Sequence, residues 1–168
     1  MVRHPFLKIA GALLLTALLG TVASPARGAE TWLNLGLGFG PLRHPPRQLF
    51  LALEVEHLVV DRRFSLWLAA EGNAQGRWVG GGLALRRPLG RRLEGELSFG
   101  PGFYPDLSHL DLGSRLQFRS SASLVIHLGT RVYAKLSATH VSDGGISRHN
   151  PGVETVRLVL GLPLGQRR

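Results

Sequence analysis

The segment that decides the fold is Leu49-Phe50-Leu51-Ala52-Leu53-Glu54-Val55-Glu56. Its odd-numbered positions hold only Leu and Val, and its even-numbered positions include Ala and two Glu. Successive side chains of a β-strand point to opposite faces, so the segment is predicted to form a strand with one leucine face and one acidic face. A soluble barrel would turn the leucines inward, whereas a membrane barrel would turn them outward to lipid.

The same alternation recurs along the chain. It is interrupted by Gly and Pro, and it is more regular than any helical period of 3.6 residues. Eight runs carry it: 32–40, 49–56, 64–71, 79–85, 93–99, 110–119, 123–138 and 154–164. This pattern predicts an all-β fold, an eight-stranded antiparallel transmembrane β-barrel with up-and-down topology.

Charged residues opposite the leucine faces favour the membrane barrel. They are Glu54, Glu56, Glu71, Glu94, Glu96, Asp111, Arg115 and Arg131. Because the interior of an eight-stranded barrel is narrow and filled by side chains, we expect these charges to pair inside it. A soluble, lipocalin-like barrel with an apolar lumen is the alternative. The aromatic residues Trp32, Trp67, Trp78 and Tyr104 are candidates for membrane-interface belts, although Trp67 shares the polar face.

The N-terminus has the layout of an export signal. Arg3 and Lys8 flank a basic region, and the uncharged apolar run 9–22 is too short for a comfortable membrane-spanning helix. We therefore predict a secretory signal peptide at 1–28 and a barrel domain at 29–168, with a retained N-terminal anchor as the alternative. There is no Cys, so neither disulfides nor thiolate chemistry is available.

The charge balance of the mature chain is basic. The full chain has 20 Lys and Arg against 11 Asp and Glu, and three of the basic residues lie in the leader, which leaves a formal charge of +6. Such a surface favours an anionic partner. Because the protein is predicted to be exported, we expect phosphorylated lipid and no nucleic acid.

Connection lengths predict the orientation of the barrel. The connections near 61–63, 87–91 and 119–121 are short, and those at 41–47, 72–76, 100–108 and 143–153 are mostly longer. Outer-membrane barrels place short turns in the periplasm and longer loops outside. The seventh strand is then expected to end at the cell surface.

Three polar residues occupy the leucine face where the last two runs meet. His140 and Ser142 close the seventh run, Glu154 opens the eighth, and all three share the parity of the leucines. Isolated polar groups facing hydrocarbon are costly, so a group of three indicates a site. Ser142 as nucleophile, His140 as base and Glu154 as orienting carboxylate would form a hydrolytic triad. In the alternative, these residues stand in water above the membrane.

His140-Val141-Ser142, the Gly-containing loop after it, Asn150-Pro151-Gly152 and Glu154 resemble the signature of the PagL-type lipid A 3-O-deacylases. The resemblance covers about residues 139–164. It implies an enzyme of the bacterial outer membrane with a His-Ser-Glu triad whose site faces the outer leaflet. It also implies lipid A (lipopolysaccharide) as substrate and hydrolysis of the acyl ester at its 3 position, which releases a 3-hydroxy fatty acid. No metal or organic cofactor is implied. The resemblance further implies a homodimer, of which the sequence itself gives no sign.

One position departs from that signature. The family usually has Asn after the serine, where it is thought to help the oxyanion hole, and this chain has Asp143. A carboxylate beside a developing oxyanion repels it, so we expect either that the backbone N–H groups of Gly144 and Gly145 take the donor role or that Asp143 points away. Asp143, Gly144 and Asn150 are the predicted oxyanion and loop support. Arg148 and His149 on the same loop are candidate contacts for lipid phosphate.

Two other functions remain open at the level of the sequence. One is a non-enzymatic outer-membrane barrel that acts in adhesion or envelope structure. The other is a soluble periplasmic barrel that binds lipid. A lipid-facing triad favours the enzyme, because a purely structural barrel has no reason to keep one.

Overall fold

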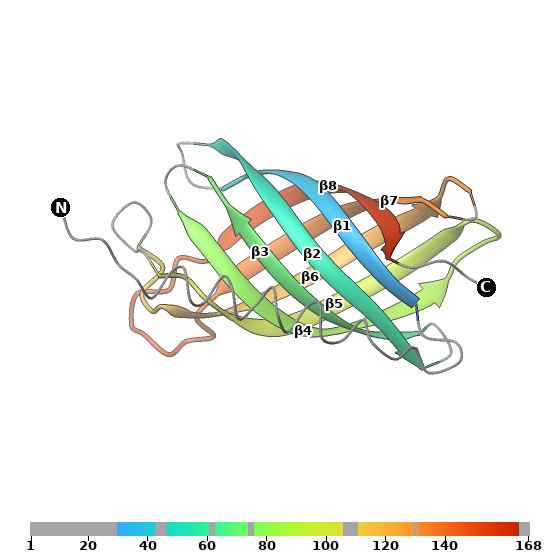
Figure 1. The fold of residues 1–168 in the computed structure, drawn as a ribbon. Helices are drawn as coiled ribbons and strands as arrows, with labels where there is room; N and C mark the ends of the chain where they lie inside the picture. Colours follow the sequence, from blue (N-terminus) through green and yellow to red (C-terminus); the bar gives the residue numbers. More distant parts are fainter. Residues whose placement is uncertain are drawn as a thin grey trace.

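The computed structural model describes residues 30–42, 47–60, 63–73, 76–105, 111–129 and 131–164, so the predicted signal peptide lies outside the described residues. The chain forms a closed antiparallel barrel in which each strand pairs with the next and the last returns to the first (Figure 1). The strands are β1 (Glu30–Gly40), β2 (Gln48–Val60), β3 (Phe64–Gly72), β4 (Arg77–Pro88), β5 (Leu93–Phe103), β6 (Leu116–His127), β7 (Tyr133–Ser142) and β8 (Val153–Leu164). The predicted fold class is confirmed. No helix in the described part of the chain is long and apolar enough to cross a membrane.

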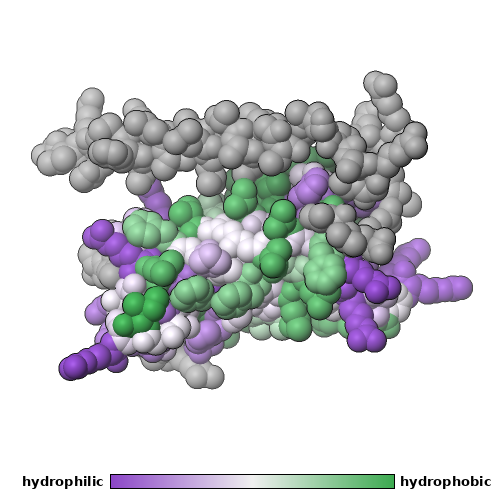
Figure 2. Space-filling model, turned by 90° about the horizontal axis from the view of Figure 1, so that it is seen from below, coloured by the Kyte–Doolittle hydropathy of each residue, from purple (hydrophilic) through white to green (hydrophobic). Residues whose placement is uncertain are grey.

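The leucine faces lie on the outside of the barrel. In the segment that opens β2, Leu51 is 71% exposed, whereas Glu54 and Glu56 are buried. Figure 2 shows apolar side chains over the middle of the barrel wall and hydrophilic ones at its two ends. This outward apolar band is the arrangement that a lipid bilayer requires.

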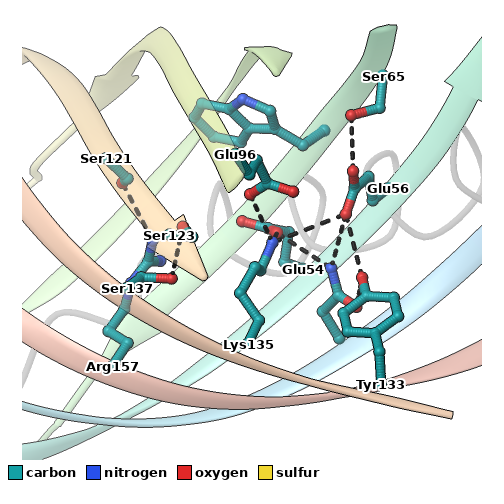
Figure 3. Close-up of polar contacts among 12 residues, drawn as sticks. Glu54, Glu56, Ser65, Glu96, Ser121, Ser123, Tyr133, Lys135, Ser137 and Arg157 are labelled. Carbon is teal, nitrogen blue, oxygen red and sulfur yellow. Dashed lines mark hydrogen bonds and ion pairs between the residues drawn. The ribbon is translucent and has the colours of Figure 1, made fainter. Parts of the chain in front are cut away.

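The interior is filled by a network of ion pairs (Figure 3). Its four carboxylates are Glu54, Glu56, Glu71 and Glu96, and its four cations are Arg86, Arg119, Lys135 and Arg157. The Lys135 ammonium lies 3.0 Å from carboxylate oxygens of both Glu54 and Glu96. The Tyr133 hydroxyl donates to Asn34 Oδ1 at 2.6 Å and lies 3.1 Å from Glu56. Because positive and negative side chains balance, the network carries no net formal charge, as a desolvated lumen requires.

Large aromatic side chains also fill the lumen. Trp32, Trp67 and Trp78 are all buried inside the barrel. The prediction of an interfacial belt is therefore wrong for Trp32 and Trp78, whereas Trp67 lies inside as its place on the polar face indicates. Trp67 and Trp78 stack with ring centroids 6.1 Å apart, and the guanidinium of Arg119 lies 3.7 Å from the Trp67 ring centroid. A narrow lumen has to be packed with side chains, and these rings supply volume that the shorter residues lack.

The boundary between the sixth and seventh strands differs from the prediction. Ser120 and Ser121 do not form a turn, because they lie in the middle of β6, where Ser121 faces inward and hydrogen-bonds Thr139 at 3.0 Å. The turn lies at 128–132 instead. As a result Asp111 and Arg115 belong to the connection before β6, and Arg131 belongs to the turn; all three are exposed rather than interior.

The connections define two ends of the barrel. The turn end carries the connections β2–β3, β4–β5 and β6–β7, together with the start of β1 and the last residues of β8, which pair with each other. The loop end carries the connections β1–β2, β3–β4, β5–β6 and β7–β8. The last of these, residues 143–152, joins the two strands that bear the candidate triad.

Candidate active site

The candidate triad is built on the hairpin of β7 and β8. His140 on β7 and Glu154 on β8 are directly opposed partners in the ladder. His140 Nδ1 lies 3.4 Å from Glu154 Oε1, and the two side chains are 47% and 23% exposed. Catalytic hydrogen bonds are often this long before substrate binds. Glu154 is therefore placed to fix the imidazole with its Nε2 edge turned away from the carboxylate.

Ser142 lies on the same face of β7 as His140. It is the last residue of the strand and is opposed by Phe118 of β6. Side chains two positions apart on a strand are spaced by about 6.6 Å along the chain, so rotation of the serine and histidine side chains can bring Oγ and Nε2 together. The side chain of Ser142 is partly exposed, at the boundary between the outer wall and the β7–β8 loop.

Gly152 packs against the edge of the His140 ring. A Cβ atom built on Gly152 would lie 2.7 Å from Cε1 and 3.4 Å from Nε2 of His140. The residue also has a φ of +65°, a conformation that L side chains rarely adopt. The loop backbone can approach the imidazole this closely only because Gly152 has no side chain.

The carboxylate of Asp143 organises the β7–β8 loop. It accepts hydrogen bonds from Gly145 N at 2.8 Å, from Ser147 N at 3.0 Å and from the Ser147 hydroxyl. The backbone N–H of Asp143 donates to Asn150 Oδ1 at 3.2 Å, which ties the two ends of the loop together. The Ser147 hydroxyl, with the backbone amides of Gly145 and Ser147, holds the pKa of the Asp143 carboxyl below its ordinary value.

These contacts bear on the departure from the family signature. The Asp143 side chain is buried and points into the loop, toward Ser147, rather than along the outer face with Ser142. Gly144 follows with a φ of +67° and is exposed. A Cβ on Gly144 would meet the Phe118 ring at 3.2 Å, so this backbone lies beside the residue that opposes Ser142.

Arg148 and His149 lie at the exposed tip of the same loop. The backbone carbonyl oxygen of His149 lies 2.6 Å from the Ser147 hydroxyl oxygen, so this tip is close to the Asp143 cluster. The structure thus brings His140 and Glu154 together, places Ser142 on their face, and leaves both basic side chains at the rim. Among the described residues, no three His, Asp or Glu side chains gather closely enough to hold a metal ion.

The wall below the triad combines small and aromatic side chains. Ser120 opposes His140, and Ala122 opposes Ala138 one step further from the loop. Beside this shallow strip, Phe99 and Phe118 stack with ring centroids 5.9 Å apart and nearly parallel planes. The outer wall beside the triad therefore has small side chains, with two aromatic rings along one flank.

The family description Lipid A 3-O-deacylase (PagL) matches residues 47–163, which is more than half of the chain and includes the whole β7–β8 hairpin up to Pro163. The chain belongs to this family. No functionally curated protein sequence shows a significant match.

Several solved structures share the fold of this chain at low sequence identity. The crystal structure of the outer membrane enzyme PagL matches with a TM-score of 0.61 and 14% identity, over 79% of this chain and 99% of that one. The N-terminal β-barrel domain of Pseudomonas aeruginosa OprF matches with a TM-score of 0.59 and 12% identity, over 80% and 97% of the two chains. A de novo designed transmembrane β-barrel matches with a TM-score of 0.57 and 8% identity, over 80% and 95%. At these identities the likenesses show a shared fold, the transmembrane type of β-barrel, and nothing further.

Two residues of the site are not predicted from the sequence. Gly152 is predicted only as part of the Asn150-Pro151-Gly152 motif, and its one signal is that glycine allows a close approach of the backbone. Ser147 was not singled out at all. Its contact with Asp143 spans four residues of irregular loop, where no periodicity indicates which side chains meet.

Proposed function

We propose that this protein is an outer-membrane esterase that removes the acyl chain ester-linked at the 3 position of lipid A. The observation that supports this most strongly is the position of the His140–Glu154 pair beside Ser142 on the lipid-facing side of the wall. Lipid A presents its acyl esters at the boundary between headgroup and hydrocarbon. A site at the loop end of the outer wall meets that boundary without removing the substrate from the membrane.

The reaction follows the serine-esterase scheme. Ser142 Oγ attacks the ester carbonyl carbon while His140 Nε2 takes the hydroxyl proton, and Glu154 stabilises the resulting imidazolium. The tetrahedral intermediate collapses, the bond from the carbonyl carbon to the sugar oxygen breaks, and His140 returns the proton to that oxygen. Water, activated by His140, then hydrolyses the acyl-serine and releases the 3-hydroxy fatty acid.

Backbone donors near the start of the loop would stabilise the oxyanion. The N–H of Gly144 is the best placed, because the Gly145 N–H already donates to Asp143. A preorganised donor of this kind contributes about 3 kcal/mol to the transition state. In this proposal Asp143 and Asn150 act indirectly, by fixing the loop that carries the donor.

The rim residues complete the proposal. Arg148, whose guanidinium pairs bidentately with phosphate, and His149 are assigned to lipid A phosphate contacts. With the site in the outer leaflet, the loop end faces the cell exterior and the turn end faces the periplasm. A homodimer, implied by the family resemblance, stays a prediction that the single chain does not test.

Mass spectrometry of lipid A after incubation with the refolded barrel tests the proposal. The native protein should remove one hydroxyacyl chain, and Ser142→Ala should leave lipid A intact. Ser120→Ala is the matched control, because Ser120 is the exposed hydroxyl that opposes His140 on the neighbouring strand. Loss of activity in Ser120→Ala with retention in Ser142→Ala would reassign the nucleophile. Unchanged lipid A with a correctly folded native barrel would favour a non-enzymatic barrel.

A further inference from the structure

The turn end of the barrel carries a cluster of exposed arginines, and we propose that it binds the phosphate headgroups of anionic glycerophospholipids. The cluster consists of Arg63 in the β2–β3 connection, Arg87, Arg91 and Arg92 around the β4–β5 connection, and Arg131 in the β6–β7 turn. We call these five residues the arginine ring. None of them belongs to the interior network or to the candidate active site.

Apolar residues in the same turns place the arginine ring at the membrane surface. Leu89 and Leu128 are each 59% exposed, although they lie in connections rather than strands. A Cβ on Gly95 would lie 3.3 Å from Leu89, so Leu89 folds back over the outer wall of β5. Leu89 thus continues the apolar band up to the β4–β5 turn, and Arg87, opposite Gly95, emerges from the outer face at the edge of that band.

The position of Arg87 suits a headgroup contact. It faces outward beside Gly95, one residue before the end of β4, where the apolar band of the wall ends. An arginine there lays its aliphatic stem along the apolar wall and lifts the guanidinium to the lipid phosphates. Arg91 and Arg92 follow in the adjoining turn, so three guanidinium groups can approach one patch of the bilayer surface.

The charge of the turn end is not balanced locally. Its described acids are Glu30 and Glu94, both only partly exposed, and Glu94 lies 3.2 Å from His127 and 3.9 Å from the interior Arg86. The loop end differs, since four described arginines there (Arg47, Arg77, Arg115 and Arg148) are accompanied by Asp111, Asp143 and Glu154. With the interior neutral, the excess positive charge of the described residues is concentrated at the turn end. Hydrophilic side chains at both ends of the barrel are visible in Figure 2.

The chemistry selects phosphate. A guanidinium donates two parallel hydrogen bonds to a phosphate. A zwitterionic headgroup attracts the guanidinium less strongly than an anionic one, because its own ammonium group repels the arginine charge. Each basic side chain near an anionic lipid surface strengthens attraction by about fivefold at moderate ionic strength. Several arginines at one level should therefore enrich anionic lipid in the shell around the turn end.

The test measures lipid selectivity directly. The mature barrel is reconstituted in phosphatidylcholine vesicles, and spin-labelled phosphatidylglycerol and phosphatidylcholine report their relative association with the protein. The native barrel should prefer phosphatidylglycerol, and the variant Arg87→Gln/Arg91→Gln/Arg92→Gln should lose at least about threefold of that preference. Both leaflets have the same composition, so the direction of insertion does not affect the result.

The matched control removes the same charge at the loop end, with Arg47→Gln/Arg77→Gln/Arg115→Gln, and should keep most of the preference. Equal losses in the two variants, or no loss at the turn end, would overturn the proposal. Millimolar inorganic phosphate distinguishes the source of the ligand: if it abolishes the preference and titrates onto the detergent-folded barrel, the site is one for free phosphate. If the triple variant fails to fold, Arg63→Gln/Arg131→Gln provides the same comparison.

Discussion

Replacing Gly152 by alanine tests how the active site is positioned. The added Cβ would lie 2.7 Å from His140 Cε1, whereas ordinary van der Waals contact begins near 3.4 Å. The ring or the loop must therefore yield by about 0.7 Å, and displacements of about 1 Å in a catalytic constellation lower rates about 100-fold. We expect kcat to fall between about 10-fold and 100-fold, with a smaller change in KM because the substrate contacts on the wall are untouched.

Backbone strain also contributes and has to be separated from the collision. An L side chain in a left-handed conformation costs roughly 1–2 kcal/mol, and Gly152 has a φ of +65°. Gly145→Ala is the matched control, because Gly145 has a φ of +85° but no heavy atom within 4 Å of an added Cβ. It introduces comparable strain into the same loop without touching His140.

The assay is the rate of 3-hydroxy fatty acid release from purified lipid A in detergent, measured over a range of substrate concentrations. Heat-modifiable migration in gels verifies that each variant has folded. Full kcat in folded Gly152→Ala would refute the idea that this glycine sets the position of the imidazole. An equal loss in Gly145→Ala would attribute the effect to loop strain instead.

Three further outcomes are expected. Glu154→Gln should lower kcat by about 10³- to 10⁴-fold, as for other orienting carboxylates, with little change in folding; a loss below tenfold would remove Glu154 from the triad. Arg119→Gln should lower the unfolding free energy by about 3–5 kcal/mol in urea titrations, because it leaves two glutamates in the barrel interior short of a partner, and an unchanged midpoint would contradict this. Because the folded-state pKa of Asp143 is lowered, the loop stabilisation it provides should be fully present above the ordinary carboxyl pKa and be lost as the pH falls through the lowered value. Amide exchange at Gly145 and Ser147, relative to an unstructured peptide at each pH, should therefore accelerate only as the pH falls below the ordinary carboxyl pKa.

The barrel could be predicted from the sequence because its defining signal is local. Alternation of Leu with Glu in β2 needs only the two-residue period of a strand, and the lipid-facing parity of His140 and Glu154 follows from the same rule. The positions of both residues on the outer face match that expectation. Their pairing across the hairpin was also accessible, since one loop joins adjacent antiparallel strands.

The error at the sixth and seventh strands has a specific cause. Leu128 and Val132 bracket the real turn, and both are even-numbered, like the outward-facing residues of β6 and β7. Alternation therefore passes through the turn in phase and conceals it. Ser120 and Ser121 resemble a turn in the sequence because both are polar, but Ser120 faces out beside His140 and Ser121 hydrogen-bonds inside the lumen.

The sequence predicts that charged side chains pair inside the barrel, but not which side chains pair with which. Alternation puts Glu54 inside the barrel without indicating that Lys135, far along the chain, will meet it. That contact depends on the register around the closed barrel, which shifts with every connection. The orientation of the Asp143 carboxylate was undetermined for a related reason, since an irregular loop has no period from which to read it.

The interior network and the candidate active site share one wall, because inward-facing residues of β7 and β8 alternate with His140 and Glu154. Thr139, next to His140 in β7, hydrogen-bonds Ser121, which also accepts from Arg157 of β8 at 3.2 Å. Arg157 in turn pairs with Glu71 on the far side of the lumen. When the inward-facing side chains of a strand are held by such contacts, we expect the outward-facing side chains between them to be well positioned too. We therefore expect the charged lumen to stabilise the strand positions on which the separation between His140 and Glu154 depends.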